Sequence, residues 1–132
     1  MGYRSKVIFG VALEHKDKFD KLIDKADRLC DNEKDKYVCD YFKKNVKIVH
    51  PKYTDKFIVF EDDWLKWIGY EGDDNFPYIE LVNDTIMEWY DDDEDIGAFI
   101  IALGEDGYKY EYGEWYEVVS EKHEISINER DS

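Results

Sequence analysis

Residues 96–103 read IGAFIIAL, an almost continuous apolar stretch that decides the fold class. A strand that is apolar on both faces is typical of the middle of a sheet, because both of its faces must be covered. Residues 5–12 (SKVIFGVA) form a second apolar stretch, β-branched and alternating, near the N-terminus. We therefore predict two strands of a sheet here, with residues 96–103 in its interior.

Two stretches of helical periodicity lie between these strands. The first, residues 14–31, has one apolar stripe, formed by Phe19, Leu22, Ile23, Ala26 and Leu29. The second, residues 76–90, has a stripe formed by Ile79, Val82, Ile86 and Trp89. Pro77 falls in the first turn of this second stretch, where proline is tolerated. Both stretches predict amphipathic helices, and residues 34–45 predict a shorter helical segment.

Short β-rich segments complete the pattern. Residues 46–50 and 56–61 predict two strands, which residues 63–70 can extend, and residues 124–128 predict a final strand. The order is therefore β-α-(α)-β-β-α-β, followed by a C-terminal extension of strand character. This order favours a single α+β domain over residues 1–132, a ferredoxin-like α/β sandwich with a mainly antiparallel sheet and a C-terminal β extension.

Residues 108–117 (YKYEYGEWYE) are the most distinctive segment. In a strand, Tyr108, Tyr110 and Tyr112 lie on one face, and the charged residues between them lie on the other. Two interpretations stay open. The tyrosine face is either buried under a helix or forms an exposed aromatic ladder, rimmed by acids, at a protein interface.

The negative charge is concentrated in the second half of the chain. Residues 1–60 contain 14 Lys and Arg and 10 Asp and Glu, a net charge of +4. Residues 61–132 contain 4 Lys and Arg and 23 Asp and Glu, a net charge of −19. In the first half the charges alternate in sign, as on a solvated helix face. In the second half they form acidic blocks, the longest being DDDED at residues 91–95.

This longest block follows the predicted helix at residues 76–90. A helix dipole favours cations at its C-terminal end, so helix stability does not explain the acids. Unpaired like charge also raises the free energy of the compact state. The block is either a set of loops that keeps the protein soluble or an electronegative surface for a basic partner. Direct binding of DNA or RNA is disfavoured, because phosphate contacts need Lys and Arg.

The acids also suggest two chemical functions, and both fail on spacing or context. Counted from Asp91, the sixth and twelfth positions are Ile96 and Ala102, whereas a calcium loop needs Gly and Glu there. The paired acids at residues 104–107 lie in a predicted turn, with no recognisable nucleophile beside them. We therefore assign no catalytic residue.

The cysteines, the histidines and the hydropathy pattern argue against a metalloprotein and against a membrane protein. Cys30 and Cys39 fit free thiols, and the three histidines show no metal-ligand spacing, so we predict no metal and no cofactor. No apolar run approaches the roughly 18–20 residues that cross a bilayer. A cytoplasmic protein without membrane contact is expected.

Several short motifs resemble a group of small uncharacterised proteins from tailed phages and prophages. The similarity lies in MGYRS at residues 1–5, WLKW at 64–67, YEG at 70–72, IALGED at 101–106 and the last strand. The resemblance implies a phage accessory protein acting in the host cell, and it supplies no catalytic or binding residues. Small acidic phage proteins often inhibit host defence enzymes, some by placing carboxylates where DNA phosphates would lie.

Our leading hypothesis is an inhibitor whose acidic half docks in the basic groove of a nucleic-acid-binding host defence protein. The predicted contact residues are Asp91, Asp92, Asp93, Glu94, Asp95, Glu61, Asp62 and Asp63, with Trp115 or Tyr116 as an apolar anchor. One alternative is a structural or self-associating phage module, possible as a homo-oligomer, whose acids serve only solubility. Another is a small enzyme or ligand-binding domain, which a pocket holding a desolvated carboxylate would favour.

Overall fold

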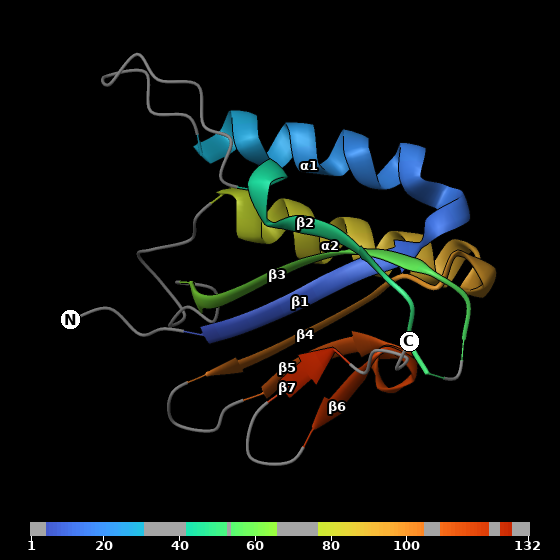
Figure 1. The fold of residues 1–132 in the computed structure, drawn as a ribbon. Coiled ribbons are helices and arrows are strands. Elements are labelled where there is room, and N and C mark those ends of the chain that lie inside the picture. The colour runs from blue at the N-terminus through green and yellow to red at the C-terminus, as the bar shows by residue number, and fades with distance from the viewer. Residues whose placement is uncertain are drawn as a thin grey trace.

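A computed structural model describes residues 5–30, 42–52, 54–65, 77–104, 109–121 and 125–127. These residues form two α-helices, a five-stranded sheet and a two-stranded sheet (Figure 1). The helices are α1 (Lys16–Cys30) and α2 (Pro77–Asp92). The strands are β1 (Ser5–Ala12), β2 (Val46–Val49), β3 (Phe57–Leu65), β4 (Phe99–Gly104), β5 (Lys109–Gly113), β6 (Val119–Glu121) and β7 (Ile125–Ile127). Four 3-10 turns connect them: η1 (Leu13–His15), η2 (Lys43–Asn45), η3 (Glu94–Ile96) and η4 (Trp115–Glu117).

The larger sheet has the strand order β2-β3-β1-β4-β5, and every neighbouring pair is antiparallel. β1 is its central strand, and Phe9 pairs with Phe60 of β3 on one side and with Ile100 of β4 on the other. β4 in turn lies between β1 and β5. The predicted α+β class is therefore confirmed, and β4 lies in the interior of the sheet as predicted. It begins at Phe99 and not at Ile96, because Ile96 ends η3 and Gly97 has a left-handed φ of +72°.

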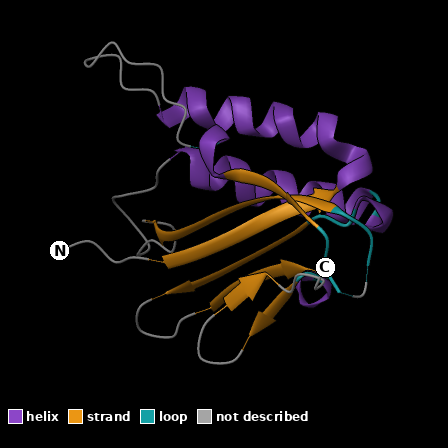
Figure 2. Cartoon of the chain, in the orientation of Figure 1, coloured by secondary structure: helices purple, strands orange, loops and turns teal. Residues whose placement is uncertain are grey.

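Both helices cover one face of this sheet (Figure 2). Alternate residues of β1 point toward the helices and bury aromatic rings there. The Phe9 ring stacks on Phe60 with 4.9 Å between centroids and tilts against Phe19 of α1 at 5.8 Å. Removing one such ring costs about 3–5 kcal/mol, so this cluster fixes the helices on the sheet.

The opposite face of the sheet is covered by the C-terminal segment. Ile8, Phe57, Phe99 and Ile101 on this face pack with a second set of buried residues from the end of the chain, Val118, Val119 and Ile125. Figure 2 shows the β6–β7 pair on the side of the sheet away from the helices. The predicted C-terminal β extension is therefore present, and its role is to bury the second apolar face of β4.

The connection between α1 and β2 is anchored by a buried carboxylate. Asp27, only 7% exposed, accepts hydrogen bonds from the backbone N–H groups of Phe42 (2.7 Å) and Lys43 (3.2 Å). Of the helical segment predicted at residues 34–45, the described part is Phe42 and the turn η2. The rest of that segment, Cys39, the Cys30 side chain and most of the strand extension predicted at 63–70 lie outside the described residues.

Candidate functional site

An open depression of about 720 Å³ lies at one end of the strands of the larger sheet. β1 and β5 end there, and β3 and β4 begin there, because neighbouring strands are antiparallel. Five carboxylates line it, which we call the acidic rim: Glu14, Asp55, Asp95, Glu114 and Glu117. They come from four separate segments of the chain, namely η1, the β2–β3 connection, η3 and the residues around η4.

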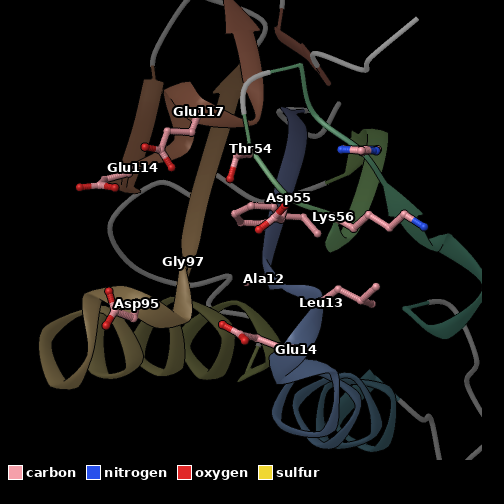
Figure 3. Close-up of a pocket in the computed structure, with 12 residues that line it drawn as sticks. Ala12, Leu13, Glu14, Thr54, Asp55, Lys56, Asp95, Gly97, Glu114 and Glu117 are labelled. Atoms are coloured by element: carbon pink, nitrogen blue, oxygen red, sulfur yellow. The ribbon is translucent and has the colours of Figure 1, made fainter. Parts of the chain in front are cut away.

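The acidic rim carries little compensating positive charge. Figure 3 shows Glu14, Asp95, Glu114 and Glu117 around one opening, whereas the Lys56 side chain extends away from them. The other basic side chain in the lining is His50, and Glu14 lies 3.5 Å from His15, a pair that is ionic only when the imidazole is protonated. At neutral pH the opening is therefore strongly negative and suited to ammonium or guanidinium groups.

Two glycines place these acids at the rim. Gly97 has φ +72° and lies against the Phe57 ring, and Gly113 has φ +80° and packs against β4. A Cβ at Gly113 would stand 2.3 Å from the carbonyl oxygen of Ala98, so only glycine fits. These left-handed residues let the chain leave the sheet sharply, which brings Asp95 and Glu114 to the depression.

The predicted acidic block 91–95 is only partly free for a partner. The side chains of Asp91, Asp92, Asp93 and Asp95 are exposed, and that of Glu94 lies outside the described residues. Asp91 accepts a 2.6 Å hydrogen bond from the Tyr112 hydroxyl, and Asp93 accepts one of 3.0 Å from the backbone N–H of Asp95. Two of the acids therefore stabilise the end of α2 and the turn that follows, a local role that the sequence interpretation missed.

The acids predicted at residues 61–63 do not join the rim. Glu61 follows Val59 on the face covered by the C-terminal segment, and its carboxylate lies 2.6 Å from Lys47 Nζ and 3.8 Å from Lys6 Nζ. Asp62 is half-buried in β3, and the Asp63 side chain lies outside the described residues. Glu61 is thus an ion-paired sheet residue, because the registers of β1 and β2 bring two lysines beside it.

The two predicted aromatic anchors differ in exposure. Trp115 is half-buried on the core beneath the sheet, with Lys109 Nζ 5.3 Å from its ring centroid. Tyr116 is 61% exposed and meets the Trp115 ring edge-on at 6.0 Å. Tyr116 lies between Glu114 and Glu117 in the chain, so the exposed anchor stands directly beside the acidic rim.

The tyrosine face of β5 is packed under a helix. Tyr110 and Tyr112 are half-buried against the helix-side core, and Tyr112 meets Tyr90 of α2 edge-on at 5.5 Å. The hydrogen bond to Asp91, burial and the negative charge of Asp91 together raise the pKa of the Tyr112 hydroxyl above its usual value. Of the two interpretations left open, the covered face is the one found for these two residues, and Tyr108 lies outside the described residues.

Sequence reasoning missed four of the five rim acids: Glu14, Asp55, Glu114 and Glu117. A signal was present for two of them, since Glu14 follows and Asp55 precedes a predicted strand, whereas Glu114 and Glu117 lie inside the segment 108–117. Which strand ends lie side by side depends on the strand order, which local patterns do not reveal. The sequence-based prediction relied on runs of acids.

The described residues contain neither a metal-ligand cluster nor a buried carboxylate in the depression. They contain no group of three or more His, Cys, Asp or Glu that could hold a metal ion. Their one buried charged group, Asp27, caps backbone N–H groups away from the depression, so the desolvated pocket carboxylate of the enzyme alternative is not found among them. None of their helices is long and apolar enough to span a membrane.

The rim therefore offers negative charge, hydrogen-bond acceptors and one exposed aromatic ring, arranged around an open depression. Comparison of the chain with protein-family models, with curated proteins and with solved structures finds no match.

Proposed function

We propose that the protein is an inhibitor that binds a basic, nucleic-acid-binding host defence protein through the acidic rim and Tyr116. The observation that carries the proposal is the gathering of five carboxylates from four chain segments around one depression. Such gathering raises the free energy of the folded chain, and a basic partner relieves that repulsion. The exposed Tyr116 ring supplies the kind of aromatic contact that anchors protein interfaces.

The partner's chemistry follows from the charge. A groove that binds DNA or RNA is lined with Lys and Arg, and rim carboxylates can occupy it in place of phosphates. Nucleic acid itself is repelled by the same field. Association is expected to be fast and to weaken steadily with salt, because exposed charges are screened beyond about 8 Å at physiological ionic strength.

The proposal also covers the finer fold class and the setting. The order β2-β3-β1-β4, with α1 and α2 on one face, supports a ferredoxin-like sandwich to which β5, β6 and β7 are additions. The resemblance to small phage proteins supports a phage accessory protein in the host cytoplasm.

Two matched variants test the function. The rim variant D95N/E114Q/E117Q removes three charges at the depression, and the control E80Q/D84N/E88Q removes three from the exposed side of α2. Each protein is used to capture partners from a bacterial extract. The rim variant should bind the captured protein about tenfold more weakly, since ion pairs at the protein surface contribute about 0.5 kcal/mol each; Asp95 and Glu117 are exposed and Glu114 is half-buried. The control should bind like the wild type.

A second measurement tests inhibition. The captured protein is mixed with a fluorescently labelled DNA duplex, and anisotropy reports whether the inhibitor displaces the DNA. Displacement by the wild type, and weaker displacement by the rim variant, would support the proposal. Equal capture by the rim variant and the control would overturn the assignment of the surface, and a complex that still binds DNA would overturn inhibition.

A further inference from the structure

One edge of the sheet is basic although the chain carries a net charge of −15. Residues 42–56 contain five lysines and a single acid. We call Lys43, Lys44, Lys47 and Ile48, on η2 and β2, the basic edge. Lys43 and Lys44 are exposed and have no ion-pair partner among the described residues. Lys47 Nζ and Lys6 Nζ both lie near one carboxylate, that of Glu61.

The basic edge also has an apolar contact surface. Ile48 is 53% exposed and lines an open groove of about 540 Å³ between β2 and α1, together with Val46 and Ile23. The α1 side of the groove also carries Lys16, Asp20 and Asp24, of which Lys16 and Asp20 form an ion pair. Among the described strands β2 pairs only with β3, so no described strand pairs with its other edge. An unpaired edge with an exposed isoleucine is a ready contact for another chain.

The basic edge and the acidic rim complement each other. One is positive with Ile48 exposed, and the other is negative with Tyr116 exposed. β2 and β5 form opposite edges of the five-stranded sheet, and η4 follows β5 (Figure 1). Four strand spacings of about 4.8 Å separate the two edges by about 19 Å. Lys43 and Lys44 of one copy therefore cannot pair with Glu114 and Glu117 of the same copy.

We propose that the basic edge of one copy binds the acidic rim of a second copy, head to tail. This inference rests on the surface used in the proposed function and adds its regulation, because a rim covered by a second copy is closed to the basic partner. The contact is heterologous, so every assembled chain of copies keeps one free rim and one free basic edge. Dilution or an excess of basic partner then releases the inhibitory surface.

The salt dependence of this contact differs from that of partner binding. Two copies in contact have centres about 35 Å apart, from the size expected for 132 residues. Their net charges repel over that distance at 0.01 M salt, where the Debye length is about 30 Å, but not at 0.15 M, where it is about 8 Å. Contacting pairs persist at 0.15 M and are screened at 1 M. Self-association should therefore be strongest at intermediate salt.

Complementary charge reversals test the pairing by sedimentation velocity. The wild type should form dimers and longer species at 0.15 M NaCl and high micromolar concentration, and fewer at 0.01 M and 1 M. K43E/K44E and E114K/E117K should each stay monomeric. Their mixture should form dimers and longer alternating species, because the intact rim of one variant meets the intact edge of the other and the reversed edge meets the reversed rim. The combined variant K43E/K44E/E114K/E117K should regain self-association.

Circular dichroism checks that each variant is folded. The self-association of the wild type at the three salt concentrations is a test that does not depend on any variant. A wild type that stays monomeric at all three salt concentrations, or a mixture of folded variants without dimers, would overturn head-to-tail pairing. The two proposals fail separately. K43E/K44E keeps the rim and should capture the basic partner as well as the wild type does. If neither protein captures a basic partner, the proposed function is contradicted and the proposed self-association is not.

Discussion

The hydroxyl of Tyr112 donates a 2.6 Å hydrogen bond to Asp91 and so joins β5 to the last turn of α2. An acid at the C-terminal end of a helix is unfavourable for the helix dipole. Here the tyrosine gives that acid a partner and keeps it beside the tyrosine face. A residue that looks misplaced in the helix is therefore explained by a neighbour 21 positions away in the chain.

Replacing Tyr112 with phenylalanine should lower the thermal midpoint by about 2–4 °C, the effect of losing one hydrogen bond in a domain of this size. The pKa of the hydroxyl is raised in the folded protein, so its stabilising effect is complete below the ordinary tyrosine pKa of 10.0 and is lost as the pH rises above it. Thermal melts at pH 8 and pH 11 should show a smaller pH effect in Y112F than in the wild type. Y116F, at an exposed ring, serves as the control, and equal pH effects in all three would contradict the assignment.

At the scale of elements, the periodicity of apolar residues predicted the main helices and strands, which depend on local sequence. The helices predicted at residues 14–31 and 76–90 and the strand predicted at 5–12 correspond to α1, α2 and β1, because their apolar spacing is set by the face they bury. The strand predicted at 96–103 corresponds to β4, which begins three residues later, at Phe99. The turn η4 inside the segment 108–117 was missed, because it depends on the close approach of Gly113 to β4. Local patterns do not record such tertiary contacts.

The candidate site was harder to predict than the fold for a related reason. Glu14 and Asp55 become neighbours of Glu114 only through the strand order, and Glu61 becomes an ion-paired residue only through the registers of β1 and β2 with β3. Asp95 was the one rim acid predicted, because it stands in an acidic run. Composition gave the sign of the surface, and tertiary pairing gave its location.

Gly113 couples stability to the acidic rim. Gly113→Ala places a Cβ 2.3 Å from the Ala98 carbonyl oxygen and forces a non-glycine residue into the left-handed region. The backbone conformation alone costs about 1–3 kcal/mol, and β5 must shift as well. Urea unfolding should report this loss, and capture of the basic partner should weaken because Glu114 and Glu117 move. A variant as stable as the wild type would show that β5 does not fix η4.

At the scale of the whole molecule, the imbalance of charge is the main electrostatic fact. A net charge of −15 raises the free energy of the folded chain by self-repulsion, and the rim is one place where that repulsion is concentrated. The proposed partner binding and the proposed self-association would both relieve it, and both use the same carboxylates.

Salt should therefore stabilise the monomer. At low micromolar protein, the thermal midpoint is expected to rise by roughly 2–5 °C between 0.01 M and 0.5 M NaCl, as screening removes about 1 kcal/mol of repulsion. A variant that joins D95N/E114Q/E117Q with E80Q/D84N/E88Q carries six fewer negative charges, and its midpoint should rise less. The same rise in both proteins would point to a general salt effect and against repulsion.

The cover on the back of the sheet has a consequence for synthesis on the ribosome. β6 and β7 are translated after every strand whose apolar side chains they bury, including Ile8, Phe57 and Ile101. Until β6 and β7 have left the ribosome, a nascent chain exposes an apolar sheet face, and such exposed surface promotes aggregation of incomplete chains. Stop codons or frameshifts that remove only β7 would therefore yield a chain that still forms its helices but aggregates. Such a chain would be a substrate for chaperones or proteases.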